Sequence, residues 1–248
     1  MTADGSGAID LAILTFNIRT DRGLDGRNAW WLRRQATARA IGDVDPDVAG
    51  LQEVRPLQLR YLRRRLAGYG FVSRGRAKLK GQGEHCPVLC RLDRLEGPTS
   101  WDVRWYDTAA PDRIATIAHF DRFSVLNTHL AERSSAVREA SVATLLAWVR
   151  EAAVPWIVMG DLNATPVDPP VRALLDAGFQ DALADLPPHG DGAATGHSWT
   201  GTADGRRIDH ILVSPEWDVV DASIVRSRPF GRLPSDHWPV VAHLRLKL

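Results

Sequence analysis

Apolar residues along this chain fall into two kinds of run. Short runs rich in Val, Ile and Leu, bounded by turn-forming residues, predict β-strands, and longer runs with apolar residues every three or four positions predict helices. Strands and helices are mixed, but several strands follow one another directly, which favours two packed sheets with helices outside over one parallel sheet. The predicted strands are 11–18, 48–51, 113–119, 123–127, 156–159, 208–213 and 240–246, and the predicted helices are 30–41, 57–67, 134–152 and 170–177.

The chain contains no recognisable internal repeat, linker or low-complexity segment. We therefore predict an N-terminal tail over residues 1–10 and a single domain over residues 11–248. The longest loop-like stretch, residues 185–207, is rich in Gly, Pro and Asp. Loops of this length within a compact domain are often functional.

Composition narrows the class of protein. The 248 residues are 44% hydrophobic and 25% charged, which is typical of a soluble globular protein. A formal net charge of +1 argues against a large basic surface for nucleic acid. The arginine-rich stretch 60-RYLRRRLAG-68 has helical spacing and is interpreted as a solvated helix face. No apolar run approaches the length of a membrane span, so we expect no membrane contact, and nothing indicates a protein partner.

The two cysteines, Cys86 and Cys90, lie in the apolar stretch 84-EHCPVLCR-91. Pro87 and the apolar run indicate a strand, on which the two cysteines would share a face about 13 Å apart, too far for a disulfide. There is no second pair of cysteines to complete a zinc site. Two unpaired thiols, and an N-terminus without the features of a signal peptide, predict a cytoplasmic protein. The abundance of Ala and Arg is typical of a bacterial coding bias.

Polar residues of catalytic types lie beside the apolar runs at six places. Taken singly, each has a structural explanation: Asp161 and Asn163 are turn formers, for example, and Asp209 could pair with Arg207. Together they offer hard oxygen ligands for a divalent cation and histidines with carboxylate partners, at strand ends where side chains are held rigidly. The six blocks are 15-TFNIR-19, 51-LQEV-54, 126-LNTHL-130, 160-GDLN-163, 207-RIDHI-211 and 235-SDHWPV-240.

In their order and residue types, these blocks resemble the endonuclease/exonuclease/phosphatase superfamily, which includes deoxyribonuclease I, exonuclease III-type repair nucleases, inositol polyphosphate 5-phosphatases and neutral sphingomyelinases. The resemblance runs from Leu11 to about Leu246 and includes 82-QGEHCPVLCR-91 and 112-DRIATIAHF-120. It implies an α/β fold, a four-layer α/β/β/α sandwich of two mixed β-sheets packed face to face with helices outside. It also implies an active site at one end of the sandwich, hydrolysis of phosphate esters and a requirement for Mg²⁺, with Mn²⁺ as a substitute.

The resemblance assigns a metal site to three residues. Glu53 in LQEV matches the family's main metal ligand, and a carboxylate is a ligand that Mg²⁺ prefers. Asn17 in TFNIR matches a neighbouring residue that helps to place the metal or its water. Asp236 in SDHWPV matches the acidic residue that completes the site in many members.

The resemblance also assigns catalytic and substrate-side residues. His237 matches the histidine at the scissile phosphate, with Asp209 as the carboxylate that orients it and raises its pKa. Asp161 and Asn163 match the pair that holds the attacking water and a phosphate oxygen, although the identity of the general base stays open. Further expected contributors are His129 as a second histidine near the phosphate, Glu84 as its acidic partner, Arg113 as a phosphate contact, His210 as a packing residue, and His197 and Trp199 on the substrate side of the 185–207 loop.

Three hypotheses compete for the function. The near-neutral charge favours a phosphodiesterase or phosphatase acting on a small or nucleotide-like phosphate ester. A DNA or RNA nuclease would use arginines for the phosphates and tryptophans to stack on bases. A non-catalytic binding protein on the same fold is disfavoured by the intact set of site residues. The residues available to a nuclease are Arg22, Arg27, Arg33, Arg34, the arginines at 60–65, and Trp30, Trp31, Trp105 and Trp199.

Overall fold

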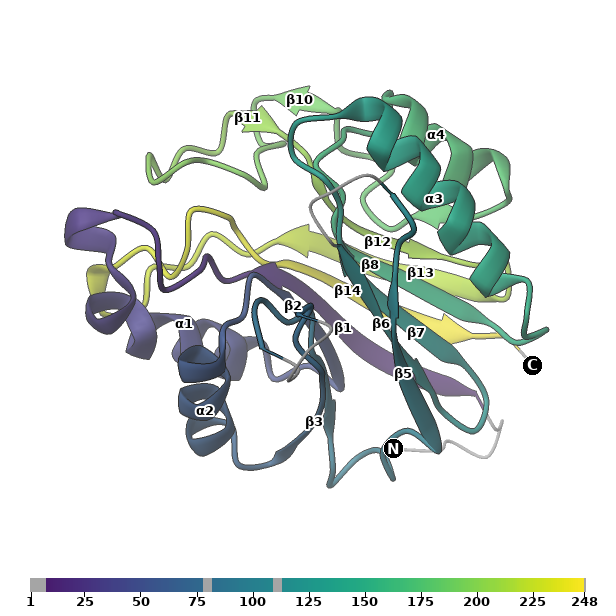
Figure 1. Cartoon of the computed structure of the whole chain (residues 1–248), viewed down its shortest axis with the longest axis horizontal. Coiled ribbons are helices and arrows are strands. Elements are labelled where there is room, and N and C mark those ends of the chain that lie inside the picture. The colour runs from purple at the N-terminus through teal and green to yellow at the C-terminus, as the bar shows by residue number, and fades with distance from the viewer. Residues whose placement is uncertain (1–7, 78–81, 109–112, 248) are drawn as a thin grey trace.

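The structure is a computed structural model that describes residues 8–77, 82–108 and 113–247. Two six-stranded mixed β-sheets lie face to face, with helices on their outer sides (Figure 1). In spatial order, the first sheet consists of β13 (Trp217–Ile224), β14 (Val240–Leu246), β1 (Ile9–Asn17), β2 (Val48–Gln52), β4 (Val88–Arg91) and β3 (Tyr69–Val72). The second consists of β5 (Ser100–Trp105), β6 (Ile114–His119), β7 (Ser124–His129), β8 (Trp156–Asp161), β12 (Asp209–Val213) and β9 (Gln180–Asp181).

Helices complete the four layers, which confirms the predicted α/β/β/α sandwich. The first pair, α1 (Trp30–Val44) and α2 (Pro56–Arg65), packs on the first sheet, and α3 (Ser135–Val149) and α4 (Pro169–Asp176) pack on the second (Figure 1). None of the helices in the described ranges combines the length and apolar character needed to cross a bilayer. Smaller elements are the 3-10 turns η1 (Gly26–Asn28) and η2 (Pro229–Gly231) and the hairpin of β10 (His189–Gly190) and β11 (Gly205–Arg206).

All seven predicted strands and all four predicted helices are present, with shifted ends. The first strand begins at Ile9, inside the predicted tail, whose residues 1–7 lie outside the described part of the chain. The strand predicted around the cysteines begins only at Val88, so Cys86 precedes it. Both cysteines are buried and free, as predicted. The predicted 185–207 loop contains the β10–β11 hairpin.

The alternation of side chains along the strands separates the core from the site. On β1, Leu11 and Ile13 face the core between the sheets, whereas Leu14 and Phe16 face the helices. Continuing the two-residue period places Asn17, the last residue of β1, on the inner side. The same change from apolar to polar occurs at one end of β7, β8 and β12, so polar side chains meet between the sheets at a single end of the sandwich.

Strand pairing brings these ends into register. The parallel pair β7 and β8 sets His129 beside Asp161, and the antiparallel pair β8 and β12 sets Asp209 opposite Asp161. Gly160 makes this approach possible. Its φ is +147°, and a Cβ there would lie 1.9 Å from the carbonyl oxygen of Thr128. Only glycine fits at this position, and it holds the ends of β7 and β8 together.

Candidate active site

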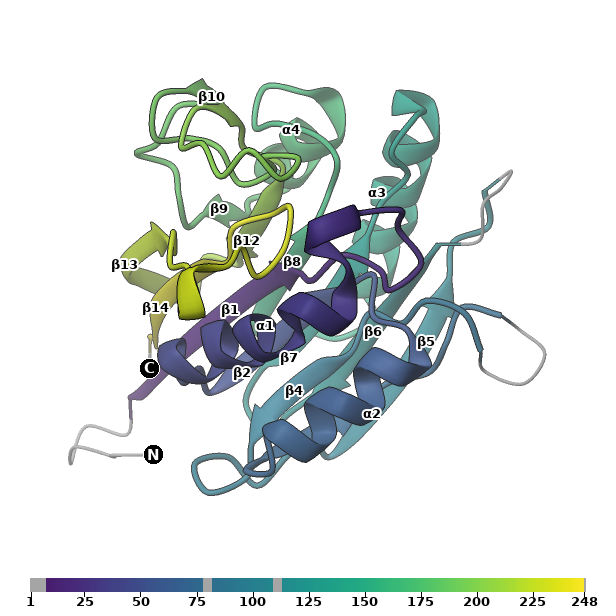
Figure 2. The same cartoon turned by 90° about the vertical axis from the view of Figure 1, so that its left-hand side faces the viewer.

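A cavity of about 830 Å³ opens at this end of the sandwich, the end that Figure 2 turns toward the viewer. The strand ends form its floor, and parts of the loops after β1 and around β11 line its sides. Its lining residues are Arg19, Thr20, Asp25, Glu53, Arg76, Glu84, Arg113, His129, Glu132, Asp161, Asn163, Gly196, Ser198, Trp199, Arg206, Ile208, Asp236 and His237.

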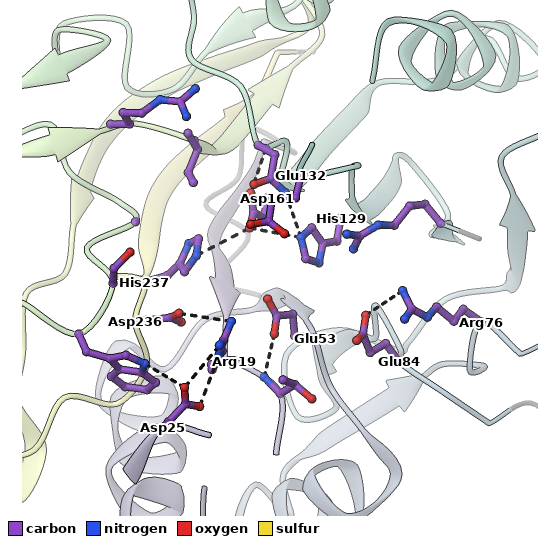
Figure 3. A pocket seen from close by; sticks show the side chains of 18 residues that line it. Arg19, Asp25, Glu53, Arg76, Glu84, His129, Glu132, Asp161, Asp236 and His237 are labelled. Carbon is purple, nitrogen blue, oxygen red and sulfur yellow. Dashed lines mark hydrogen bonds and ion pairs between the residues drawn. The ribbon is translucent and has the colours of Figure 1, made fainter. Parts of the chain in front are cut away.

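Asp161 lies at the centre of the floor (Figure 3) and is only 2% exposed. One carboxylate oxygen accepts hydrogen bonds from the Asn17 amide at 2.9 Å, and the other accepts one from the backbone N–H of Asn163 at 2.9 Å. Burial, together with the nearby charge of Asp209, raises the pKa of Asp161 to about 7. A carboxylate with this pKa can take up a proton near neutral pH.

His237 approaches Asp161 from one side. Its Nδ1 donates to Asp209 at 2.8 Å, and its Nε2 lies 3.8 Å from Asp161. Burial alone would lower the pKa of His237, but the carboxylate of Asp209, with those of Asp161 and Asp236, raises it well above the ordinary value. The surrounding carboxylates therefore favour the protonated ring, and the bond to Asp209 fixes its orientation.

His129 flanks Asp161 on the other side and is in the opposite protonation state. The Asn163 amide donates to Nε2 of His129 at 3.1 Å and to the Leu130 carbonyl at 3.0 Å. Burial and the positive charges of Arg113 and His237 lower the pKa of His129 well below its ordinary value. Because Nε2 accepts, the proton of the neutral ring resides on Nδ1, which is buried without a hydrogen-bond partner among the described residues.

Glu53 follows β2 and lines the cavity below Asp161 (Figure 3). Its carboxylate accepts hydrogen bonds from the Asn17 amide at 3.2 Å and from the backbone N–H of Thr20 at 2.9 Å. Its backbone is left-handed, with φ +60°, as is that of Asn163, with φ +51°. Such conformations cost about 1 kcal/mol or more for residues other than glycine, and they cluster at functional sites.

The structure brings most of the predicted residues to the cavity. Glu53, Glu84, Arg113, His129, Asp161, Asn163, Trp199, Asp236 and His237 all line it. Asn17 and Asp209 are completely buried behind it, where they hold Glu53, Asp161 and His237 through hydrogen bonds. The Asn17 amide oxygen accepts the N–H of Arg19 at 2.9 Å, and its amide nitrogen donates to the carboxylates of Glu53 and Asp161. His210 is buried and bonds to the Ala164 carbonyl at 2.8 Å, in line with a packing role.

Three expectations are corrected. Glu84 forms an ion pair with Arg76 at 3.1 Å, and not with His129, whose contacts are to Asn163 and Asp161. His197 is 4% exposed and does not line the cavity. Its Nδ1 accepts the N–H of Gly201, and burial lowers its pKa to about 4. Arg33 does not contribute to a surface patch, because it is 1% exposed.

Sequence reasoning missed five charged residues of the lining: Arg19, Asp25, Arg76, Glu132 and Arg206. Arg19 ends the TFNIR block and forms ion pairs with Asp25 at 3.4 Å and Asp236 at 3.7 Å, so its position beside that block was the available signal. The others lie in loops or at loop ends, where no periodic pattern marks them.

Donor groups suited to a divalent cation are present at the site. Ligand-type atoms of Asp161, Asp209 and His237 lie within 4.8 Å of one another. The imidazolium form of His237 has no free lone pair to offer a cation. Its Nδ1 also bonds to one carboxylate oxygen of Asp209, which makes that oxygen less available as a ligand. The carboxylates of Glu53 and Asp236, both on the cavity wall, are hard oxygen donors of the kind that Mg²⁺ prefers. The residues present therefore fit a hard divalent cation.

Comparisons with known proteins place the chain among relatives of the same architecture. The sequence pattern of the endonuclease/exonuclease/phosphatase family matches residues 14–237. An endonuclease/exonuclease/phosphatase from Bacteroides vulgatus is 28% identical, with a TM-score of 0.86 over 96% of this chain and 100% of its own. A mannosyl-6-phosphatase from Bacteroides thetaiotaomicron is 25% identical, with a TM-score of 0.81 over 94% of this chain and 99% of its own.

A more distant structure, D. rerio TDP2 complexed with a single-strand DNA product, is 20% identical, with a TM-score of 0.75 over 95% of this chain and 98% of its own. At that identity the likeness shows a shared fold. No curated protein sequence matches the chain.

Proposed function

The chain belongs to the endonuclease/exonuclease/phosphatase family, and on that premise we propose that it is a Mg²⁺-dependent hydrolase of phosphate esters that acts on a small or nucleotide-like substrate. The observation that carries the proposal is the position of Asp161 between His237 and His129, at 3.8 Å and 3.5 Å, on a cavity wall shared with Glu53. A proton acceptor, a fixed positive charge and oxygen donors for a metal then converge on one space.

The reaction is an in-line attack of water on phosphorus, in which a new P–O bond forms as the ester P–O bond opposite it breaks and the alcohol group leaves. Asp161 accepts the proton of the attacking water, since its pKa is raised to about 7. Asn163 helps to aim the water, because its amide and backbone are fixed between His129 and Asp161. The imidazolium of His237 stabilises the charge that develops on the phosphoryl oxygens. His129 holds the Asn163 amide in place, because its Nε2 accepts a hydrogen bond from that amide.

Glu53 and Asp236 would hold the divalent cation, with Asn17 orienting Glu53 through its amide. When bound, the cation supplies charge neutralisation at the phosphate. Manganese is an acceptable substitute, because carboxylate oxygens suit both ions.

The charge of the cavity wall supports a small substrate over a long nucleic acid. Two of its arginines, Arg19 and Arg76, form ion pairs with acidic residues of the same wall. The cavity wall contains both acidic and basic side chains, whereas a surface for nucleic acid would present a continuous basic stripe. The mannosyl-6-phosphatase relative supports a phosphorylated sugar or a similar small ester.

One observation favours a nuclease as the second candidate. A separate groove of about 500 Å³ is lined by Arg60, Arg63 and Arg64 of α2, together with Gln82 and His85. Such a groove offers basic side chains to the phosphates of a nucleic-acid strand. Binding to DNA or RNA that weakens steeply with added salt would support this candidate.

The test is an activity screen with added Mg²⁺ on p-nitrophenyl phosphate, bis-p-nitrophenyl phosphate, sugar phosphates, nucleotides, single- and double-stranded DNA, and RNA. We expect turnover of a small ester, and losses of about 10²–10⁴-fold in Glu53→Ala and His237→Ala. Both variants should melt close to the wild type, and Glu216→Ala, at an exposed glutamate outside the cavity lining, should retain full activity. Near-wild-type turnover in either site variant would overturn the assignment.

A further inference from the structure

Arg33 is a buried charge that the proposed chemistry does not use. It belongs to α1, is 1% exposed, and has no carboxylate at ion-pair distance within the described residues. Its guanidinium lies 5.2 Å from the ring centroids of both Trp30 and Trp199. Burying an arginine without a carboxylate partner costs free energy unless its N–H groups are satisfied.

Backbone carbonyls satisfy Arg33. The closest contacts are from Nη1 to the Ile18 oxygen at 2.6 Å, from Nη2 to the Arg19 oxygen at 2.8 Å, and from Nε to the Asn28 oxygen at 2.9 Å. Nη1 also donates to the Pro234 oxygen at 3.0 Å. One guanidinium thus ties the end of β1 and the loop after it to the segment that leads into Asp236.

Two of these carbonyls belong to peptide units whose N–H groups face the site. The carbonyl of Arg19 accepts from Arg33, and the N–H of the same peptide unit, that of Thr20, donates to Glu53 at 2.9 Å. The carbonyl of Ile18 accepts from Arg33, and the N–H of that unit, on Arg19, donates to the Asn17 amide oxygen at 2.9 Å. Each peptide plane therefore carries a hydrogen bond from Arg33 on one side and a hydrogen bond to a site residue on the other.

A second side chain acts on the same peptide unit. Gln58 of α2 donates to the Arg19 oxygen at 2.7 Å, beside Arg33. The backbone of Arg19 is left-handed, with φ +55°, which a residue with a side chain rarely adopts without external support. Arg33 and Gln58 supply that support. A carbonyl bonded to a cation also makes the N–H of its own peptide unit a stronger donor, because linked hydrogen bonds polarise one another.

From this arrangement we propose that Arg33 is a positioning residue that sets the affinity of the site for its divalent cation, acting on Glu53 and Asn17 through two peptide units. The inference rests on the proposed function, because it assumes that Glu53 holds the cation. Arg33 touches neither the cation nor the substrate. It fixes the direction of the Glu53 carboxylate before the cation arrives, which spares the site the free energy of ordering that side chain on binding.

The experiment measures binding of Mn²⁺ alone to the full chain by isothermal titration calorimetry, without substrate. Arg33→Lys keeps the charge but loses the planar fork, so it cannot serve both peptide units. We expect its Kd for Mn²⁺ to rise about tenfold or more, and that of Gln58→Ala about threefold to tenfold, on the scale of supporting hydrogen bonds around metal ligands. At saturating Mn²⁺, kcat of both variants should return to within about fivefold of the wild type. A raised Kd for Mn²⁺ together with a restored kcat distinguishes a positioning role from a general loss of structure.

The control variants are Arg34→Lys and Gln35→Ala, on the exposed side of the same helix, and their Kd should stay within about twofold of the wild type. Unchanged Mn²⁺ affinity in folded Arg33→Lys would overturn the inference and leave the proposed function standing. If Arg33→Lys does not fold, the Mn²⁺ affinity of Gln58→Ala is the test. An unchanged Kd in that variant would likewise overturn the inference and leave the proposed function standing. A wild-type chain that binds no Mn²⁺ would overturn the proposed metal site and this inference together.

Discussion

Two buried carboxylates lie on the strands that flank β12, and they behave in opposite ways. Asp161, on β8, is 2% exposed, and its pKa is raised to about 7 by burial and by Asp209. Asp181, on β9, is 8% exposed. Burial would raise its pKa too, but His210 and Arg207 lower it to about 2. Burial is similar at both, so the charge of the neighbours decides the outcome.

Strand β12 supplies the opposing neighbours from consecutive residues. Asp209 faces the site and adds a second negative charge near Asp161, whereas His210 faces the other side, 3.7 Å from Asp181. Arg207 completes the second cluster at 2.5 Å from Asp181. The Asp181 cluster pairs its carboxylate with Arg207, which favours the ionised form, while the Asp161 cluster holds a carboxylate whose surroundings disfavour the ionised form.

The largest effect is expected from Asp161→Asn, which tests whether Asp161 is needed for activity and destabilises the fold when ionised. We expect activity to fall by about 10²–10⁴-fold, because the proposed base is lost. Stability should move the other way. The folded-state pKa of Asp161 lies above the ordinary value of 3.8, so ionisation removes stability as pH rises from about 4 through about 7. In EDTA at pH 8 the variant should be more stable than the wild type by about 1–3 kcal/mol in urea unfolding.

That gain should shrink as pH falls through about 4 toward 3, where the wild-type carboxyl is largely protonated in both the folded and the unfolded state. An asparagine variant that is less stable than the wild type at pH 8 would show that Asp161 is a structural carboxylate. In that case the contrast with Asp181 would disappear.

Asp181→Asn tests the other side of the contrast. The change leaves Arg207 buried without its partner, so we expect a loss of about 3 kcal/mol in the free energy of unfolding at pH 7. The pKa of Asp181 is lowered in the fold, so its stabilisation is complete above about pH 4 and is lost as pH falls through about 2. Urea unfolding of the two proteins between pH 2 and 7 should therefore converge at the acid end.

A surface pair serves as the control for Asp181. Asp218 contacts Lys247 at 3.0 Å, and both side chains are about half exposed, so Asp218→Asn should unfold like the wild type at every pH. A pH-independent loss in Asp181→Asn would mean that the asparagine disturbs packing and that the ionised carboxylate stabilises nothing.

The layers of the fold were predictable because the inner strands are buried on both faces and read as apolar runs. Within the two six-stranded sheets, the strands that were missed are β3, β5, β9 and β13, which are the four edges. An edge strand such as β13 exposes many of its residues, and its pattern resembles a loop. Local sequence therefore identified the centre of each sheet and not its borders.

The site divides in a similar way. Residues at strand ends, such as Asp161 and His129, were predictable because register carries them to one place. The positions of Asp25 and Arg206 were not predictable, because the conformation of the segments that contain them depends on long-range contacts. The bond from Arg33 to the Pro234 carbonyl, for instance, joins residues 201 positions apart. No local pattern encodes such a contact, and the same limitation made Arg33 look like a surface residue.

Added Mg²⁺ should stabilise the folded protein through the Asp161 region, by less than the effects of the substitutions above. A ligand that binds only the folded state, at ten times its Kd, adds about 1.4 kcal/mol to the free energy of unfolding. We expect this increment in the wild type and its absence in Glu53→Ala. Asp181→Asn should show the full increment, because the two clusters share no described hydrogen bond or ion pair, and separate sites contribute additively. Urea unfolding with Mg²⁺ and with EDTA measures all three proteins.

If the increment persists in Glu53→Ala, the cation binds elsewhere. If Asp181→Asn abolishes it, the two carboxylate clusters form one cooperative unit, and the division between a reactive region and a stabilising one does not hold.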